Sequence, residues 1–218
     1  MGRALACAMC AGLAFAQASQ PAVERIDLAE RLGAGKIRVV NRNITRMQSP
    51  RDGVHLSENA NVGLAWIDGT QFSEGTIEVD VRGKDVFQQS FLGLAFHGQD
   101  DRTYESVYLR PFNFRATDPA RHQHAVQYMT LPDFDWPRLR EQFPEEFENP
   151  VSASLSPTDW VPLRVVVAAQ RVQIFAGADN APALDVRKLG TLSGGTIGLW
   201  LGNGSDGDFA NLRITRTR

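Results

Sequence analysis

The sequence predicts an all-β protein, a two-sheet antiparallel jelly-roll sandwich. Many short segments alternate apolar and polar residues, turn signals rich in Gly, Asp, Asn and Pro separate them, and helix-period patterns are almost absent. A parallel α/β sheet would need helices between its strands, so that class is excluded. The length of 218 residues suits one domain. The formal net charge of -2 gives no electrostatic reason to expect nucleic acid or an anionic membrane as a partner.

The first 18 residues are typical of a cleavable export signal. Arg3 precedes an apolar run, residues 4–16, that is too short to span a bilayer, and small residues fit cleavage after Ala16 or Ala18. Both cysteines of the chain fall in this segment, so we expect no disulfide in the mature protein. The sequence therefore predicts a secreted or periplasmic protein with no membrane span, stabilised by its core alone.

An N-terminal arm, residues 19–35, precedes the domain proper, residues 36–218. Within the arm, residues 23–32 fit a short helix or a segment lying on the domain, and Gly33-Ala34-Gly35 ends it. Strands are then predicted at residues 37–40, 54–57, 61–67, 75–82, 91–97, 104–110, 124–131, 160–168, 171–176, 183–186, 195–202 and 209–215.

Two of the connections have distinct characters. Asp68-Gly69 is a strong turn signal and should end the strand at 61–67. Residues 115–123 are expected to form a polar loop. Residues 132–149 combine Pro, aromatic and charged side chains, which indicates a long loop that holds a short helix near 139–143 and lies over one face or beside a site.

The strands predicted at 91–97 and 104–110 carry the residues that bear most directly on function. Successive side chains of a strand point to opposite faces, so Leu92, Leu94 and Phe96 share an apolar face. The second strand directs Glu105, Val107 and Leu109 to one side. Its other side carries Tyr104, Ser106, Tyr108 and Arg110. One face of the pair can form core, and the other has the aromatic and cationic character of a surface that binds a polar ligand.

Four segments together resemble a known family. They are FSEGTIEVDVRG, FLGLAFHGQDD, YESVYLRPFNF and GTIGLWLGNGSDGDFANLRI. They resemble the concanavalin A-like lectin/glucanase jelly rolls, and are most similar to the secreted bacterial, laminin-G-like branch that includes 3-keto-disaccharide hydrolase-type domains. The resemblance covers about residues 36–216. It implies the jelly-roll fold and a saccharide or glycoconjugate as partner. This superfamily holds lectins, glycoside hydrolases, lyases and adhesive domains, so the fold does not determine the activity.

One motif tests the hydrolase interpretation. Family-16 glucanases place two catalytic Glu residues on one strand face, with an Asp between them. Here Glu78 and Asp80 match the first two positions, but Arg82 stands where the second Glu is needed. We therefore interpret the three side chains as the solvated face of an ordinary strand.

Given the resemblance to lectin/glucanase jelly rolls, seven residues are candidates for binding a sugar. Aromatic rings cover the apolar edges of sugars, while Arg, Asn, Gln and His bond to hydroxyls. The candidates are Tyr104, Tyr108, Arg110, Asn113, His124, Gln127 and Trp136. The alternative is structural: Arg110 pairs with Glu105 or Asp101, and Tyr108 belongs to the core.

The candidates for catalysis are His97, Glu105, His122 and His124. His122 and His124 would share a face if extended, and zinc would need a third ligand, for which Glu105 is the one available. No acidic partner stands at motif spacing, so ordinary surface or hydrogen-bonded histidines are the favoured explanation, and we expect no metal ligands. Residues 203–208 are rich in oxygen ligands that Ca²⁺ accepts, but their spacing is not that of an EF-hand, and we interpret them as a turn.

The sequence thus favours a secreted domain that binds or processes carbohydrate. A glycoside hydrolase or lyase of the 3-keto-disaccharide type is the first alternative, and a non-catalytic structural or adhesive domain is the second.

Overall fold

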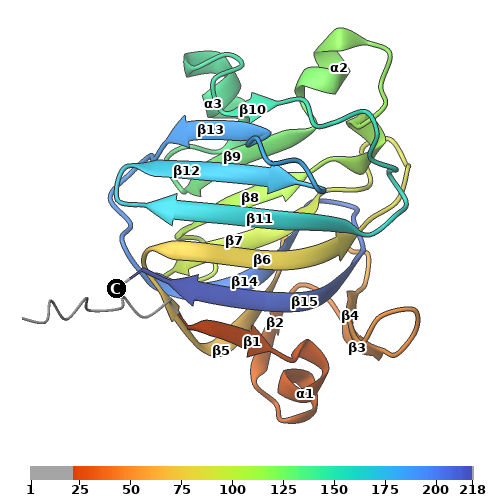
Figure 1. Cartoon of the computed structure of the whole chain (residues 1–218), viewed down its shortest axis with the longest axis vertical. Coiled ribbons are helices and arrows are strands. Elements are labelled where there is room, and N and C mark those ends of the chain that lie inside the picture. Colours follow the sequence, from red (N-terminus) through yellow and green to blue (C-terminus); the bar gives the residue numbers. More distant parts are fainter. Residues whose placement is uncertain (1–21, 218) are drawn as a thin grey trace, which may run out of the picture.

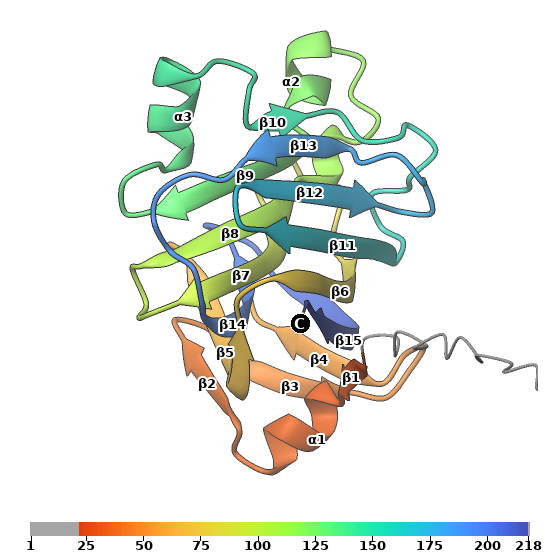
Figure 2. The same ribbon diagram turned by 60° about the vertical axis from the view of Figure 1, so that its left-hand side comes forward.

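The computed structural model describes residues 22–217. The predicted export signal, residues 1–18, lies outside this range. Two antiparallel sheets pack face to face (Figures 1 and 2). None of the helices in residues 22–217 is both long and apolar enough to cross a membrane.

Sheet A has eight strands. Their order is β13-β12-β11-β6-β15-β4-β3, and β1 also pairs with β15. The strands are β1 (Val23–Ile26), β3 (Ile44–Met47), β4 (Gly53–Leu56), β6 (Gly75–Arg82), β11 (Val161–Ala168), β12 (Arg171–Ala176), β13 (Leu184–Arg187) and β15 (Gly207–Arg216).

Sheet B has seven strands in the order β10-β9-β8-β7-β14-β5-β2. They are β2 (Ile37–Val40), β5 (Gly63–Phe72), β7 (Leu92–Gly98), β8 (Tyr104–Leu109), β9 (Val126–Leu131), β10 (Glu148–Asn149) and β14 (Gly195–Leu201). The short helices are α1 (Leu28–Gly33), η1 (Pro111–Asn113), α2 (Pro119–Gln123) and α3 (Trp136–Gln142). The predicted jelly-roll sandwich is confirmed.

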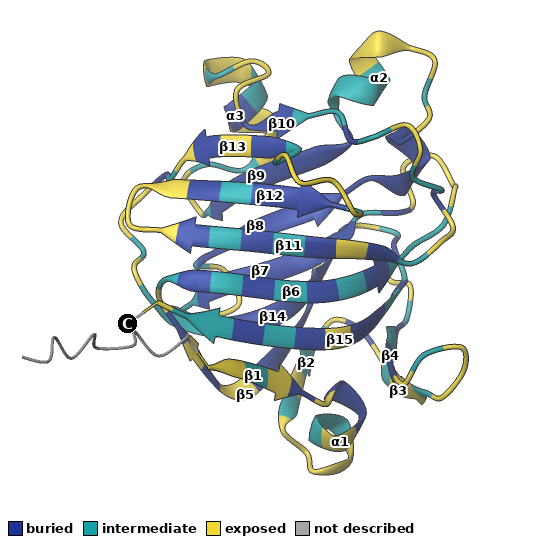
Figure 3. Cartoon of the chain, in the orientation of Figure 1, coloured by how far each residue is buried: buried dark blue, intermediate teal, exposed yellow. Residues whose placement is uncertain are grey.

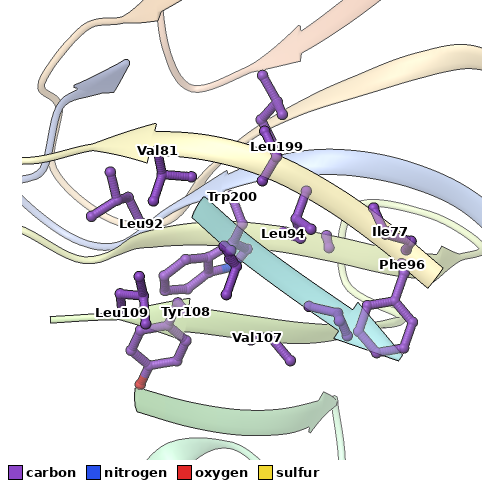
Figure 4. Packing of buried hydrophobic residues seen from close by; sticks show 14 of the residues in the cluster. Ile77, Val81, Leu92, Leu94, Phe96, Val107, Tyr108, Leu109, Leu199 and Trp200 are labelled. Carbon is purple, nitrogen blue, oxygen red and sulfur yellow. The ribbon is translucent and has the colours of Figure 1, made fainter. Parts of the chain in front are cut away.

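The core lies between the inner faces of the two sheets. Figure 4 shows Ile77 and Val81 of β6 in the same apolar cluster as Leu92, Leu94 and Phe96 of β7. The register of β7 on β8 pairs Leu94 with Val107 and Leu92 with Leu109, so the two strands share this apolar face as predicted. Full burial of each such side chain contributes roughly 1.5–3 kcal/mol.

The segment predicted as an arm is joined to sheet A. Residues of β1 pair antiparallel with β15, from Val23 opposite Thr215 to Ile26 opposite Leu212. Asp27 caps α1 by accepting a hydrogen bond from the backbone N–H of Glu30 at 2.9 Å. Leu28 and Ala29 of α1 are buried.

The expected turn at Asp68-Gly69 is not a chain reversal. Strand β5 continues through it to Phe72, and the ladder with β14 is irregular between the pairs Thr196–Gln71 and Gly198–Trp66. Gly69 has a positive φ of 81°, and the Thr70 hydroxyl accepts from the backbone N–H of Ile197 at 3.2 Å. The Asp-Gly pair therefore forms a bulge within the strand. A bulge, like a tight turn, needs the positive φ that glycine adopts easily.

Other differences concern short elements. Strands β3 and β10, of four and two residues, were not expected from the sequence. The expected polar loop at 115–123 contains α2, capped by Asp118, whose side chain accepts from the backbone N–H of Ala120. Consequently β9 begins at Val126 and not at His124. The helix expected near 139–143 is α3, which begins at Trp136.

The outer face of sheet A is solvated, as the interpretation of Glu78, Asp80 and Arg82 predicted. All three side chains are partly exposed, between the buried Ile77, Val79 and Val81 of the same strand (Figure 3). Asp80 pairs with Arg51, and Arg82 pairs with Asp208 at 2.6 Å.

Candidate functional site

The outer face of sheet B carries an aromatic layer. Alternation and register place Trp66, Trp200, Tyr104 and Tyr108 on this face. Trp200 stacks on Tyr108 with centroids 4.5 Å apart, and Trp66 meets Tyr104 edge-on at 5.7 Å. Figure 4 shows Trp200 and Tyr108 side by side. The indole N–H of Trp200 donates to the Tyr104 hydroxyl at 3.2 Å. The structure buries both Trp66 and Trp200 on the outer side of the sheet.

Glycines let these rings lie flat against the sheet. A Cβ at Gly98 or Gly198 would come within 2.3 or 2.8 Å of the Trp66 ring, and one at Gly202 within 2.6 Å of Phe91. The four rings of the layer are therefore 1–4% exposed, although they stand on the outside of a sheet. Burial raises the pKa of Tyr104 to about 12, so its hydroxyl stays a proton donor at neutral pH.

A polar network continues from this layer at the end of β8. We call it the Arg110 network, and it consists of Tyr108, Arg110, His124, Gln127, Arg140 and Glu148. The Arg110 guanidinium donates to the Tyr108 hydroxyl at 2.9 Å, to Oε1 of Gln127 and to the His124 carbonyl at 2.8 Å. Tyr108 donates to the same Gln127 oxygen at 2.8 Å.

Local sequence explains how the chain reaches this arrangement. Pro111 cannot donate to a ladder, so β8 ends before Arg110 and η1 begins. Arg110 still receives backbone support, because its N–H donates to the Ala125 carbonyl at 2.8 Å. The Asn113 amide donates to the His124 carbonyl at 3.1 Å and holds the chain where it enters β9. Asn113 is thus a support beside the network, not a member of it.

Arg140 and Glu148 were not anticipated from the sequence. Arg140 donates to both carboxylate oxygens of Glu148, at 2.9 Å each, and its guanidinium lies 5.1 Å from the centre of the Trp136 ring. Arg110 reaches the same carboxylate at 3.5 Å, and Nδ1 of His124 lies 2.8 Å from it. Glu148 lies in the two-residue strand β10 and pairs with Gln127 of β9. A strand of two residues is too short to show alternation in the sequence.

The network has an inner and an outer end. Tyr108, Arg110, Gln127 and Glu148 are almost fully buried. Toward solvent, the side chains of Arg140 and His124 are 34% and 27% exposed. Trp136, one of the seven candidates for binding a sugar, is 49% exposed. Six of the seven binding candidates therefore gather at this end of sheet B, and Tyr104 lies in the adjoining aromatic layer.

Three charges dominate the electrostatics of the network. Burial raises the pKa of Tyr108, while Arg110 and Arg140 act to lower it and Glu148 to raise it. Burial also lowers the pKa of His124, where Glu148 opposes the effect and the two guanidinium groups add to it. His124 is therefore neutral at neutral pH, and the site contains two cations and one anion.

Three buried polar atoms of this region make no hydrogen bond within residues 22–217: Nε2 of Gln127, the hydroxyl of Ser106 and Nδ1 of His124. Nδ1 of His124 differs from the other two in lying 2.8 Å from the Glu148 carboxylate. Ser106 lies between Tyr104 and Tyr108 along β8, and its cross-strand neighbours are Ala95 and Met129. A buried polar group without a partner costs about 1–3 kcal/mol, so each such atom needs an explanation.

The catalytic candidates His97 and Glu105 lie on the inner face of sheet B. Alternation alone would place His97 on the outer face, but its backbone is left-handed, with φ of 52°, and the β7–β14 ladder is irregular there. Nδ1 of His97 lies 2.7 Å from Glu105, which also accepts from Tyr128 at 2.6 Å and pairs with Lys188 at 3.3 Å. These side chains are at most 8% exposed, so this cluster belongs to the core.

The expected pairings of these residues are corrected. His122 lies in α2 and His124 at its C-terminal cap, so the two are not on an extended segment, and Glu105 is on the other side of sheet B. Arg110 pairs with Glu148 and not with Glu105 or Asp101. In residues 22–217 no three His, Cys, Asp or Glu side chains come together as a metal site. In the segment considered for Ca²⁺, Asp206 pairs with Lys84 and Asp208 with Arg82.

A separate surface depression of about 510 Å³ lies at the junction of β5, β7 and β14. Gly98, Gln99, Thr196 and Arg216 are among its lining residues. None of the residues predicted from the sequence lines it, and we assign no function to it.

Comparisons with known proteins bear on the fold. A scan against models of protein families finds no match, and a search of curated proteins finds none either. Among solved structures, the carbohydrate-binding module CBM66 from Bacillus subtilis is similar, with a TM-score of 0.58 and 15% identity over 83% of this chain and 96% of that chain.

Two further solved structures have the same fold. The exoplasmic/lumenal domain of VIP36, in a Ca²⁺/Man3GlcNAc-bound form, has a TM-score of 0.52 and 12% identity over 82% of this chain and 84% of that chain. A β-glucanase from Bacillus licheniformis has a TM-score of 0.53 and 13% identity over 81% of this chain and 83% of that chain. At such identities the likeness shows the fold alone, and it agrees with the two-sheet jelly-roll sandwich.

Proposed function

We propose that this concanavalin A-like jelly roll binds saccharide outside the cytoplasm, on the outer face of sheet B. Trp136, Arg140 and His124 form the part of the site that meets solvent, and Arg110 and Gln127 lie beneath them. Aromatic rings and forked hydrogen-bond donors are the groups that recognise the two kinds of surface on a sugar. The fold adds support, because similar structures include a carbohydrate-binding module and the VIP36 exoplasmic/lumenal domain in its Ca²⁺/Man3GlcNAc-bound form.

The unpartnered polar atoms carry the proposal. Nε2 of Gln127 and the Ser106 hydroxyl are buried on one face, beside four aromatic rings, with no acceptor or donor to meet them. A stable core normally satisfies such atoms or replaces them by apolar ones. Both residues have no exposed surface, so a ligand rich in hydroxyl groups would satisfy both atoms by displacing the side chains that cover them.

The test uses substitutions that remove these atoms with little cost to folding. Ser106→Ala deletes a hydroxyl that makes no hydrogen bond, so the free energy of unfolding should not fall. Gln127→Glu keeps the acceptor used by Arg110 and Tyr108 and removes the unpartnered donor. Trp160→Phe is the matched control, because the indole N–H of Trp160 is also buried and without a hydrogen bond in residues 22–217, but its ring lies beside Arg51 and beside Arg82 of sheet A.

The measurement is binding of the mature protein to a glycan array, followed by titration calorimetry on the best ligand. We expect Ser106→Ala and Gln127→Glu each to weaken binding by about tenfold, the value of one hydrogen bond to a buried group, and Trp160→Phe to leave it unchanged. If the folded wild-type protein binds no glycan, the proposal is wrong, and a non-catalytic adhesive domain becomes the favoured interpretation.

Catalysis at the same site is a second candidate, favoured by one observation. His124 and Glu148 bring an imidazole and a carboxylate within 2.8 Å, and His124 is the partly exposed member. A neutral histidine can act as a general base. Incubating the protein with its best glycan and analysing the products decides between a lectin and a hydrolase or lyase, with His124→Gln as the inactive variant if turnover occurs.

A further inference from the structure

We propose that the saccharide recognised by the Arg110 network is acidic, and that its carboxylate binds at Arg140. This inference rests on the proposed function and names the class of ligand. It follows from the balance of charge and of hydrogen-bond donors at the site.

Two guanidinium groups share one carboxylate. Arg140 contacts Glu148 through Nε and Nη2, and Arg110 contacts it through Nη1. The side chains of Arg110 and Glu148 are only 5% and 3% exposed, so solvent does little to screen this pair. Arg110 and Glu148 balance each other, so Arg140, whose side chain is 34% exposed, is the cation without a carboxylate of its own.

Glu146 and Glu105, two nearby carboxylates, do not pair with Arg140. The pKa values of Tyr108 and His124 respond to the same three charges, Arg110, Arg140 and Glu148, and the lowered pKa of His124 leaves it neutral. Within residues 22–217, Glu146 pairs with Arg187, and Glu105 pairs with Lys188 and His97 on the far side of the sheet. The three charges of the network, those of Arg110, Arg140 and Glu148, therefore sum to one positive charge.

The exposed end is also suited to a carboxylate. Arg140 uses two of its three nitrogen atoms on Glu148, which leaves Nη1 without a hydrogen-bond partner in residues 22–217. Its guanidinium is held over the Trp136 ring at 5.1 Å, so it is positioned beside an exposed aromatic platform. A uronate sugar presents a ring face for the Trp and a carboxylate for the Arg, and charge-assisted pairs of this kind are among the stronger polar contacts.

The experiment compares one sugar in a charged and an uncharged form. A glycan array holding neutral, uronate-containing and sulfated oligosaccharides identifies the class, and the best uronate ligand is then titrated beside its methyl ester. Arg140→Gln removes the proposed contact. Arg138→Gln is the matched control on the same helix, because Arg138 donates to the Asp133 carbonyl and has no carboxylate partner in residues 22–217.

We expect uronate binding that weakens about tenfold on methyl esterification, on Arg140→Gln, or both, with Arg138→Gln like wild type. Affinity should also fall with added salt. Equal affinity for the ester, or binding to neutral glycans alone, would overturn the acidic class and leave the proposed function standing. Preference for sulfated over uronate glycans would show that the acidic group recognised is a sulfate and not a carboxylate. Binding to no glycan would overturn the proposed function itself.

Discussion

The outer faces of the two sheets use their polar residues in opposite ways. On sheet A, Glu78, Asp80 and Arg82 alternate with buried residues and remain partly exposed. On sheet B, the outward-pointing Tyr108 and Gln127 are buried, and their polar atoms bond to Arg110. Both sheets have the same inward core, so the difference arises on their outer sides alone.

The outer face of sheet B forms a second buried layer, which the outer face of sheet A lacks in the described residues. Glycines at 98, 198 and 202 let aromatic rings lie against the sheet, and the rings reduce the access of water to neighbouring polar groups. Polar interactions are worth more where water is excluded. The same residue types should therefore contribute differently to stability on the two faces.

Arg110→Met should have the largest effect. It removes a buried cation from Glu148, Tyr108 and Gln127 and should lower the free energy of unfolding by about 3 kcal/mol. Arg82→Met is the counterpart on sheet A, where the pair with Asp208 is 30% and 13% exposed, and it should cost about 1 kcal/mol or less. Urea denaturation measures both, and equal losses would mean that the two faces do not differ in the way described.

His124→Gln should have an intermediate effect that depends on pH. Burial lowers the pKa of His124, so below its ordinary value of 6.5 the unfolded chain takes up a proton that the folded protein resists. Wild-type stability therefore falls as the pH drops below 6.5, and the variant should lose less between pH 7.5 and pH 5.5. Urea midpoints at the two pH values measure this, with His122→Gln as the matched substitution, and identical losses in wild type and His124→Gln would exclude the effect.

Glu78→Gln should have the smallest effect. Glu78 is partly exposed and faces Arg164 and Arg213 across the ladder, where solvent screens charge. Its removal should change the free energy of unfolding by no more than about 0.5 kcal/mol. A larger loss in urea denaturation would show that the charged face of sheet A is held together more tightly than its exposure indicates.

The fold could be predicted wherever alternation is long. The strands at 75–82 and 171–176 have the same bounds in the structure as in the prediction. Buried and exposed positions alternate along a half-buried strand, so apolar and polar residues alternate in its sequence. The strands β3 and β10 are too short to show a period, and the Asp68-Gly69 bulge uses the residues of a turn.

The site could be predicted only in part, for a related reason. Tyr108, Arg110 and Gln127 share a face through strand geometry, which the sequence reveals. Arg140 and Glu148 come from a short helix and a two-residue strand, and they meet through folding of the 132–149 loop. The left-handed backbone at His97 moved one candidate to the opposite face, a change that depends on a single torsion angle.

The pairing of β1 with β15 determines how the protein can be tethered. Val23 lies opposite Thr215, so the first and last strands that the structure describes run side by side, while α2, α3 and β10 lie at the other end of the sandwich (Figure 1). A neighbouring domain or a solid support attached through either strand would leave the Arg110 network pointing away from the attachment. Immobilisation by one end or by the other should then leave the same face accessible.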